Sequence, residues 1–195
     1  MTDLELNMAK HRTIETERLK LRPVTLADAE DMYEYASDEE TTYYVFERHS
    51  CFNKTEEAIV NYFIKDPLGK FGIELKASRK LIGTIDLRVK HEKHRAIMGY
   101  VLNKDYQGKG YMTEAAHAVL EHAFLTLNID CVAALHDERN EASGRVMDRL
   151  GMEKEGVMRH VGEWKNGEYF NDVYYSILKQ EFIDTQGEKM STSKQ

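Results

Sequence analysis

Cysteine, proline and long apolar runs are all scarce in this chain of 195 residues. The two cysteines, Cys51 and Cys131, are far apart and lack the C-x-x-C spacing of a zinc or redox site. The two prolines leave no proline-rich linker, and we find no internal repeat. No apolar run approaches the roughly 20 residues that span a bilayer, and the first residues, MTDLELNMAKHR, lack the apolar segment of a signal peptide. The sequence therefore predicts a cytoplasmic protein with no membrane partner.

Acidic residues outnumber basic ones, 34 Asp and Glu against 27 Lys and Arg, which gives a net charge of −7. This balance disfavours nucleic acid as a partner and favours a cationic ligand or substrate. Hydrophobic residues make up 42% of the chain and charged residues 31%, as in folded proteins rather than disordered ones. A chain of this length builds one sizeable core. We expect one domain over residues 14–182, with flexible ends at 1–13 and 183–195.

The first half of the chain predicts strands and two helices. RLKLRPV alternates apolar and polar residues as a half-buried strand does, and Thr25 is placed to cap a helix over LADAEDMYEYAS. Asn53, with Glu56 three residues later, predicts the start of a second helix. The runs FGIELKA, LIGTIDLRV and AIMGYVL then predict three antiparallel strands.

The second half predicts two more helices and a hairpin. TEAAHAVLEHAFLTLN has helical apolar spacing, and CVAAL suits an interior strand. NEASGRVMDRLG predicts a helix that ends at Gly151, and Asn166-Gly167 predicts a tight turn between two strands. The pattern indicates a single α/β (α+β) domain with one mixed sheet and about four helices.

The stretch YQGKGYMTEAA, Tyr106 to Ala116, joins the last of the antiparallel strands to a helix and contains Gly108 and Gly110. The unpaired N–H groups at the start of a helix can bind phosphate, and glycine lets a ligand approach the main chain. The spacing matches neither the nucleotide P-loop nor the dinucleotide G-x-G-x-x-G pattern. On these residues alone, a phosphate site of another kind and a simple connecting turn both remain open.

Four segments in order give the chain a family resemblance. TERLKLRPVTLADA, GYVLNKDYQGKGYMTEA, NEASGRVMDRLGMEKEG and WKNGEYFNDVYYSIL resemble the GNAT N-acetyltransferases, particularly the RimJ/RimL-like branch that includes ribosomal-protein N-terminal acetyltransferases. The resemblance extends over residues 14–182. It implies a mixed, mostly antiparallel sheet of about seven strands whose central strands splay apart. It also implies direct transfer of acetyl from acetyl-CoA to a primary amine.

The same resemblance implies where coenzyme A would bind. The family's pyrophosphate loop, Q/R-x-x-G-x-G/A, matches Gln107 and Gly110 but has Met112 at its last position, where a large side chain would move the loop or narrow the approach. Pantetheine would run beside the strand that ends in Val101 and Leu102. The implied cofactor-binding residues are Val101, Leu102, Gln107, Gly108, Lys109, Gly110, Tyr111, Met112, Thr113, Asn140 and Ser143.

Two residues are candidates for the proton transfers. Ser143 stands where many family members have a tyrosine, and would donate a hydrogen bond to the departing coenzyme A sulfur; its structural alternative is a place in the first turn of a helix capped by Asn140. Glu163 would be the base that takes a proton from the amine, with Glu74 and Asp86 as weaker candidates and a solvated surface acid as the alternative.

The sequence leaves the identity of the acceptor substrate open. A protein N-terminal α-amine, with a pKa of about 7.7–8.0, is roughly 10% free base at pH 7 and demands less of a base than lysine. Small amines, such as an antibiotic, a polyamine or an amino-acid derivative, are the alternative, as is a catalytically silent acyl-CoA-binding protein. The aromatic segment Tyr43 to Phe46 is a candidate acceptor contact. His91 and His94 lie among charged residues and predict a solvated turn, so we expect no metal, and a homodimer is compatible with the sequence.

Overall fold

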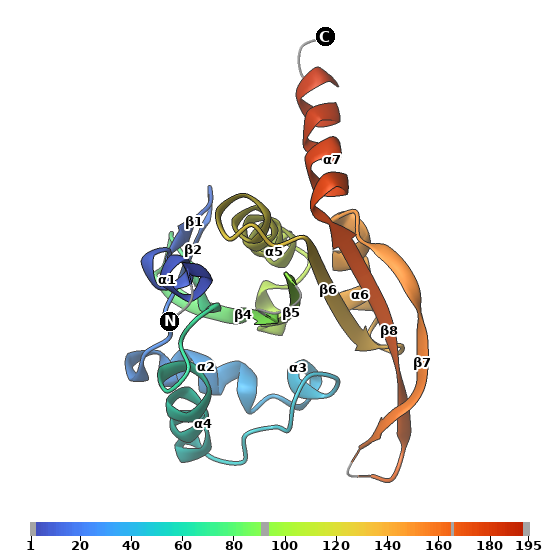
Figure 1. Ribbon diagram of the computed structural model, residues 1–195. Coiled ribbons are helices and arrows are strands. Elements are labelled where there is room, and N and C mark those ends of the chain that lie inside the picture. Colours follow the sequence, from blue (N-terminus) through green and yellow to red (C-terminus); the bar gives the residue numbers. More distant parts are fainter. Residues whose placement is uncertain (1–2, 91–93, 165, 193–195) are drawn as a thin grey trace.

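The computed structural model, which describes residues 3–90, 94–164 and 166–192, contains one eight-stranded mixed sheet (Figure 1). The strand order is β1-β2-β3-β4-β5-β6-β8-β7, and within the described residues only β5 and β6 pair in parallel. The strands are β1 (Ile14–Glu15), β2 (Leu19–Arg22), β3 (Lys70–Leu75), β4 (Lys80–Lys90), β5 (Arg95–Leu102), β6 (Cys131–Asp137), β7 (Glu153–Glu163) and β8 (Tyr169–Leu178). The predicted fold class is confirmed, and the strand beyond the expected seven is the two-residue β1.

The four predicted helices are present as α2, α4, α5 and α6. Short 3₁₀ or π segments precede or extend three of these helices and lie in the loop before α5. The helical elements are α1 (Asp3–Lys10), η1 (Leu26–Asp28), α2 (Ala29–Ala36), α3 (Glu39–Thr42), α4 (Phe52–Ala58), η2 (Ile59–Ile64), η4 (Lys104–Tyr106), α5 (Tyr111–Glu121), η5 (His122–Thr126), α6 (Glu141–Arg149) and α7 (Lys179–Thr192).

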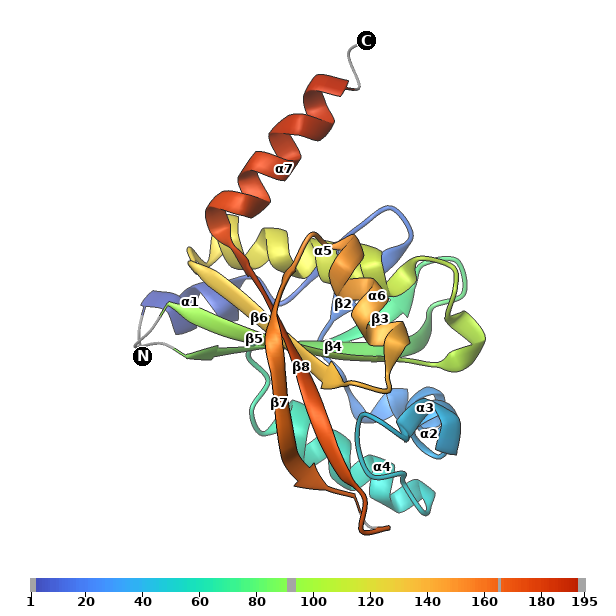
Figure 2. The ribbon, with the colours of Figure 1, turned by 90° about the vertical axis from the view of Figure 1, so that its right-hand side faces the viewer.

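Helices cover both faces of the sheet. Figures 1 and 2 show α5 and α6 on one side of β4 and β5, and α2, α3 and α4 on the other. The larger apolar cluster includes Val119 and Leu120 of α5, and the smaller one includes Met32 and Tyr35 of α2. Each such fully buried apolar side chain stabilises the fold by about 1.5–3 kcal/mol relative to exposure. The two clusters hold the sheet rigidly between its helices.

Both ends of the described chain are helical. Helix α1 lies in the segment expected to be a flexible end, and its Met8 is 6% exposed and belongs to the larger core cluster. Helix α7 extends away from the body in both views, and near its start Phe182 packs on Phe124 (Figures 1 and 2). Leu4 of α1 also packs against the larger core cluster. With so few apolar contacts among the described side chains, neither helix has the long periodic pattern that would predict it.

The predicted helix starts have mixed outcomes. Thr25 caps η1 as predicted, since its N–H donates to Asp28 Oδ2 at 2.8 Å. Asn53 is not the N-cap of α4, because that helix begins at Phe52 and its N-cap is Cys51. The Asn53 amide instead donates to Glu57 Oε1 at 3.0 Å along the helix. The prediction at Asn53 is wrong because its side chain finds a partner within the helix.

The predicted C-terminal hairpin is confirmed. β7 and β8 pair antiparallel, and the chain turns at Asn166 and Gly167, where the Gly167 N–H donates to the Trp164 carbonyl at 2.8 Å. Gly167 has a φ of 83°, which favours glycine. The hairpin brings Trp164 and Phe170 to the inner side of the sheet, where their rings lie 4.9 Å apart.

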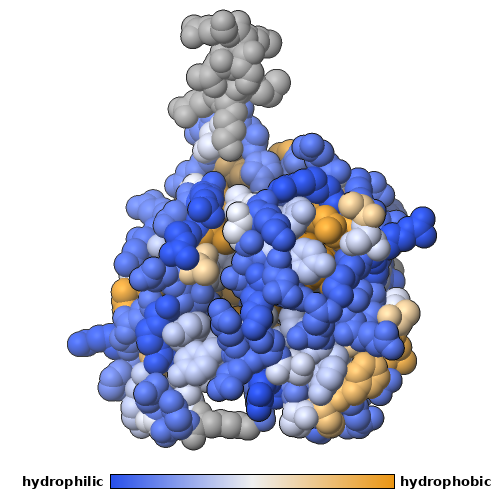
Figure 3. Space-filling model, turned by 180° about the vertical axis from the view of Figure 1, so that it is seen from behind, coloured by the Kyte–Doolittle hydropathy of each residue, from blue (hydrophilic) through white to orange (hydrophobic). Residues whose placement is uncertain are grey.

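The surface seen in Figure 3 is mostly hydrophilic, with apolar colour confined to separate patches. This agrees with the mean hydropathy of −0.60. Among the described residues, no helix is long and apolar enough to cross a bilayer. The apolar side chains are therefore concentrated in the two core clusters and in the cavities described below.

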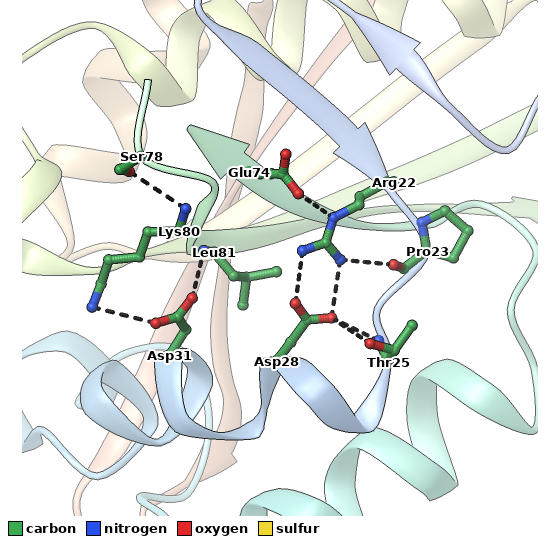
Figure 4. A network of polar contacts seen from close by, with 9 residues as sticks. All are labelled: Arg22, Pro23, Thr25, Asp28, Asp31, Glu74, Ser78, Lys80 and Leu81. Atoms are coloured by element: carbon green, nitrogen blue, oxygen red, sulfur yellow. Dashed lines mark hydrogen bonds and ion pairs between the residues drawn. The ribbon is translucent and has the colours of Figure 1, made fainter. Parts of the chain in front are cut away.

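A partly buried ion network ties the first helices to the sheet (Figure 4). The guanidinium of Arg22 on β2 contacts Asp28 at 2.7 Å and Glu74 of β3. Burial acts to raise the pKa of the Asp28 carboxyl, but the hydrogen bonds from Arg22 and Thr25 outweigh it and hold that pKa below its usual value. Arg22 thus neutralises the buried carboxylate of Asp28 and the partly buried carboxylate of Glu74.

Replacing Arg22 tests how much this network contributes. Arg22→Met keeps much of the side-chain volume but leaves Asp28 and Glu74 without a cation. We therefore expect the free energy of unfolding to fall by about 3 kcal/mol. Lys54→Met is the matched control, because Lys54 and Glu57 form an exposed pair on α4, and we expect a change within about 0.5 kcal/mol. Urea denaturation measures both. Equal losses in the two variants would contradict the role of Arg22.

Candidate functional site

The two central strands separate partway along their length. β5 and β6 pair from Arg95 opposite Cys131 to Met98 opposite Ala134, and the ladder ends there (Figure 2). Each strand continues beyond that point, β5 to Leu102 and β6 to Asp137. This is the expected splay of the central strands. It leaves the ends of both strands free to face a ligand.

Two cavities meet at this separation. One, of about 500 Å³, is bounded by the loop between β5 and α5 and by α6, and we call it the loop cavity. The other, of about 710 Å³, is bounded by the segment after α3, by η2 and by the β7–β8 hairpin, and we call it the aromatic cavity. The residues that line both are Tyr44, Val45, Tyr100, Val101, Asn140 and Ser143. We refer to these shared residues as the junction.

The loop before α5 points backbone donors into the loop cavity. Gly108 and Gly110 have φ values of 73° and 78°, which favour glycine, and Gly110 is the N-cap of α5. The hydrogen bond from the Glu114 N–H to the Gly110 carbonyl, at 3.0 Å, is the first of the helix. The amides of Tyr111, Met112 and Thr113 precede that bond and belong to the unpaired first turn. The arrangement suits an anion.

Side chains of the loop shape it rather than fill the cavity. Gln107 Nε2 donates to the Leu102 carbonyl at 3.1 Å and so ties the loop to the end of β5. Lys109 Nζ folds back to the Asp105 carbonyl at 2.8 Å, and Lys109 is absent from the cavity lining. Arg18 holds the loop from outside, donating to the Lys109 carbonyl at 3.0 Å.

Most of the predicted cofactor residues share the loop cavity. The lining includes Val101, Leu102, Gln107, Gly108, Gly110, Tyr111, Met112, Thr113, Asn140 and Ser143. Lys109 is the exception, because its side chain turns back onto the loop. The residues predicted from separate segments of the sequence therefore lie together around one cavity.

Cations that the sequence analysis missed line the same cavity. Arg145 and Arg149 of α6 stand across from the loop, with Lys104 and Arg139 nearby. Lys104 contacts Asp38 at 2.6 Å, Arg139 contacts Asp137 at 2.8 Å and Arg145 contacts Glu141 at 3.2 Å, so part of the charge of these three cations is already paired. The spacing of Arg145 and Arg149, four residues apart in a predicted helix, was a signal that they share one face.

The side chain of Met112 points away from the cavity. Met112 is 6% exposed and packs in the larger core cluster with Ala115, Ala116 and Val119 of the same helix. These positions follow helical spacing, so the sequence already indicated that Met112 faces the core. The Met112 side chain is therefore largely taken up by the core, and Met112 is also one of the residues that line the loop cavity.

Truncating Met112 tests this packing role. We expect Met112→Ala to lower the free energy of unfolding by about 2–4 kcal/mol, because it removes a buried side chain and leaves a cavity. Thermal and urea unfolding of the variant and the parent measure this difference. A loss below about 0.5 kcal/mol would show that the side chain is not part of the core.

Aromatic rings and carboxylates line the aromatic cavity. Tyr44, Val45 and Phe46 of the segment expected to contact the acceptor are in the lining, while Tyr43 is 44% exposed. Trp164 also lines it and donates from Nε1 to Asp137 Oδ2 at 3.1 Å. The other aromatic residues are Tyr35, Tyr62, Phe63, Tyr100 and Phe170, and the acids are Glu47, Asp86, Asp137 and Asp172.

Asp86 of β4 is the most enclosed of the acids whose pKa rises. Tyr62 of the π-helical segment η2 donates its hydroxyl to Asp86 Oδ2 at 2.7 Å. Arg88 Nε lies 3.1 Å from Oδ1, but this buried oxygen accepts no hydrogen bond from the part of the chain that the structure describes. Burial raises the pKa of Asp86, and Arg88 and Tyr62 offset only part of that effect. Burial and the neighbouring Asp137 also raise the pKa of Asp172.

The other predicted base candidates lie elsewhere. Glu163 is exposed at the end of β7, opposite Tyr169, and is not in the lining of either cavity. Glu74 is held in the ion network with Arg22. Of the three acids considered from the sequence, Asp86 alone lines the aromatic cavity.

A tyrosine that the sequence analysis did not consider meets Ser143. Asn140 Oδ1 accepts from the Ser143 N–H at 3.2 Å, so Asn140 caps α6. The Ser143 hydroxyl donates to the Tyr100 hydroxyl at 3.1 Å, and that hydroxyl donates to the Ser143 carbonyl at 3.0 Å. The paired hydroxyls lie at the junction of the two cavities.

The described residues contain no candidate metal centre. Over residues 3–90, 94–164 and 166–192, no group of three or more His, Cys, Asp or Glu side chains could hold an ion. His91, half of the H-x-x-H pair, lies outside these residues. His136 lines the aromatic cavity, and its Nδ1 bonds to the Asp137 carbonyl at 2.7 Å.

In sequence and in structure, the chain is similar to known acetyltransferases. The family model for the acetyltransferase (GNAT) domain matches residues 18–153. The uncharacterized N-acetyltransferase YnaD of Bacillus subtilis is 35% identical over 170 residues, which cover 87% of this chain and 98% of YnaD. A GNAT-family acetyltransferase structure from Bacillus anthracis superposes with a TM-score of 0.79 at 30% identity, over 87% of this chain and 99% of that one.

Two further relatives have acceptors in their names. The [ribosomal protein uS5]-alanine N-acetyltransferase of Escherichia coli is 30% identical over 49% of this chain and 53% of its own length. The spermidine N(1)-acetyltransferase of Escherichia coli is 24% identical over 85% of this chain and 88% of its own length. The family match covers most of the domain, and this chain belongs to the GNAT family of acetyltransferases, whose acetyl donor is acetyl-CoA.

Proposed function

We propose that this acetyltransferase transfers acetyl from acetyl-CoA in the loop cavity to a primary amine in the aromatic cavity, by direct attack of the amine on the thioester. The observation that carries the proposal is that the two cavities meet where β5 and β6 part. Holding both reactants in one continuous site can supply on the order of 7–11 kcal/mol of the acceleration.

The loop cavity fits the donor's charge. The first-turn amides of α5 and the side chains of Arg145 and Arg149 would face the phosphates, and neither contribution requires the Lys109 side chain. Val101 and Leu102, at the end of β5, would pair with the pantetheine arm through their main-chain groups. A backbone N–H near Val101 would stabilise the developing oxyanion.

The aromatic cavity fits an ammonium group on an apolar body. Rings provide apolar contact and attract cations, and Asp86 and Asp172 add negative charge. We favour a protein or peptide N-terminal α-amine, because it needs the least help in losing its proton. The relative that acetylates a ribosomal-protein alanine supports this choice, and the spermidine relative keeps small amines as the alternative.

We assign the base to Asp86 ahead of Glu163. Asp86 lines the cavity, and its raised pKa makes it a better proton acceptor than an ordinary carboxylate. Tyr62 fixes its orientation. Glu163 is exposed and would have to act from outside the cavity.

Disrupting the loop tests donor binding. In calorimetry we expect the parent to bind acetyl-CoA, and Gly110→Asp to weaken binding at least about 100-fold, since a carboxylate would oppose the pyrophosphate and strain the cap of α5. Gly151→Asp is the matched control. Gly151 has a φ of 75° and open space around it, so it carries similar strain without touching the cavity, and acetyl-CoA affinity should stay within about threefold of the parent.

The acceptor panel completes this experiment. Coenzyme A release is followed with free N-terminal peptides, the same peptides N-terminally blocked but with a free lysine, and polyamines. We expect release with the free N-termini. Release only with polyamines would support the small-amine alternative, and binding without release from any amine would overturn the enzymatic proposal.

The base assignment predicts a pH effect. The catalytic form of Asp86 is deprotonated, so the kcat/KM of the parent should rise with pH through the raised pKa of Asp86. Asp86→Asn should lower kcat/KM at least about 100-fold and abolish this rise with pH, whereas Glu163→Gln should keep the pH profile of the parent. If Glu163→Gln alone abolished the rise of kcat/KM with pH, the base would be Glu163 instead.

A further inference from the structure

We propose that Tyr100 is the proton donor to the departing coenzyme A sulfur, and that Ser143 returns the proton to Tyr100. The inference rests on the proposed function, since it places the sulfur at the junction of the two cavities. The junction has three side-chain hydroxyls, those of Tyr44, Tyr100 and Ser143, and the hydroxyls of Tyr100 and Ser143 are hydrogen-bonded to each other.

The two hydroxyls come from opposite sides of the site. Tyr100 is on β5, two residues beyond the last pair with β6, and Ser143 is in the first turn of α6. Asn140 fixes that turn through its bond to the Ser143 amide. Because a strand and a capped helix each hold one partner, the pair is preorganised before any substrate binds.

The direction of the hydrogen bonds suits a relay. The Ser143 hydroxyl already donates to the Tyr100 oxygen at 3.1 Å. The phenolic hydrogen donates to the Ser143 carbonyl at 3.0 Å and reaches another acceptor by rotation about the C–O bond. Tyr100 can thus give up its proton on one side and receive one on the other.

Tyr100 holds its proton at neutral pH. Burial raises the pKa of Tyr100 to about 12, although the hydrogen bond from Ser143 acts to lower it. The raised pKa makes the phenol a weaker acid than a solvated tyrosine, so the proton leaves only as negative charge develops on the sulfur. A serine hydroxyl alone is a poorer acid than a phenol, so Ser143 gains a role as the second member of a pair rather than as the sole donor.

The amine nitrogen forms a bond to the acetyl carbon, the carbon–sulfur bond breaks, and its electron pair stays on sulfur. The sulfur takes the phenolic proton of Tyr100, the Ser143 hydroxyl passes its proton to the tyrosine oxygen, and water returns a proton to serine. The proton that the amine loses passes to Asp86 and then to solvent, so the net products are an amide and a free thiol.

Removing each hydroxyl separately tests the pair. Tyr100→Phe should lower kcat at least about 100-fold, and Ser143→Ala about tenfold, with acetyl-CoA affinity within about threefold of the parent in both. The double variant should be no slower than Tyr100→Phe alone, because both hydroxyls serve one proton path. Tyr33→Phe is the control: Tyr33 packs against Phe52 and lines neither cavity, so kcat should not change. A kcat for Tyr100→Phe within about threefold of the parent would overturn the proposal.

A second substitution separates proton donation from packing. Replacing Tyr100 with 3,5-difluorotyrosine keeps the hydroxyl and the ring but lowers the phenol pKa. We expect kcat of this variant to fall at alkaline pH where the parent stays active, since the donor is then ionised. A profile that matches the parent would overturn the role as donor. If the parent is active but Tyr100→Phe keeps its kcat, or the difluorotyrosine variant keeps the parent pH profile, the proposed function still stands. A parent that releases no coenzyme A would overturn the function itself.

Discussion

The early end of the ladder between β5 and β6 is the constraint on which the site depends. Strands that part leave N–H and C=O groups that need other partners, and side chains that no longer pack across the gap. Here the separation follows Met98 and Ala134, and both cavities open at it. The flanking pairs, β4 with β5 and β6 with β8, continue past that point and hold the two edges apart.

The parallel orientation of β5 and β6 adds a second consequence. A parallel pair needs a crossover, and the helix of the crossover starts at the carboxyl end of the first strand. α5 therefore begins beside the end of β5, and α6 begins just after the end of β6. Both helix starts, capped by Gly110 and Asn140, converge where the strands separate. The same topology thus supplies the gap, the backbone donors of the loop and the turn that contains Ser143.

Features that depend on residues close together in the sequence could be predicted, and contacts between residues far apart in the sequence could not. Strand alternation, short apolar runs, helical spacing and the Asn166-Gly167 turn are local signals, and they predicted β2 to β6, four helices and the hairpin. The Tyr100 and Ser143 hydroxyls are 43 positions apart, and Tyr62 and Asp86 are 24 apart, so no local pattern joins them. The position of the Lys109 side chain could not be predicted for a related reason, since a long flexible side chain binds whichever carbonyl its loop presents.

The distribution of charge explains why the junction is neutral. Cations outnumber acids in the lining of the loop cavity, where Glu40 and Glu141 are the acids, and acids outnumber cations in the lining of the aromatic cavity, which includes Arg88. Each cavity would therefore attract the substrate that carries the opposite charge. The polar side chains at the junction are hydroxyls and an amide, from Tyr44, Tyr100, Asn140 and Ser143. A lysine or protonated histidine in their place would repel the incoming ammonium or pair with the acids around Asp86, whereas a phenol can donate a proton there without carrying a charge of its own.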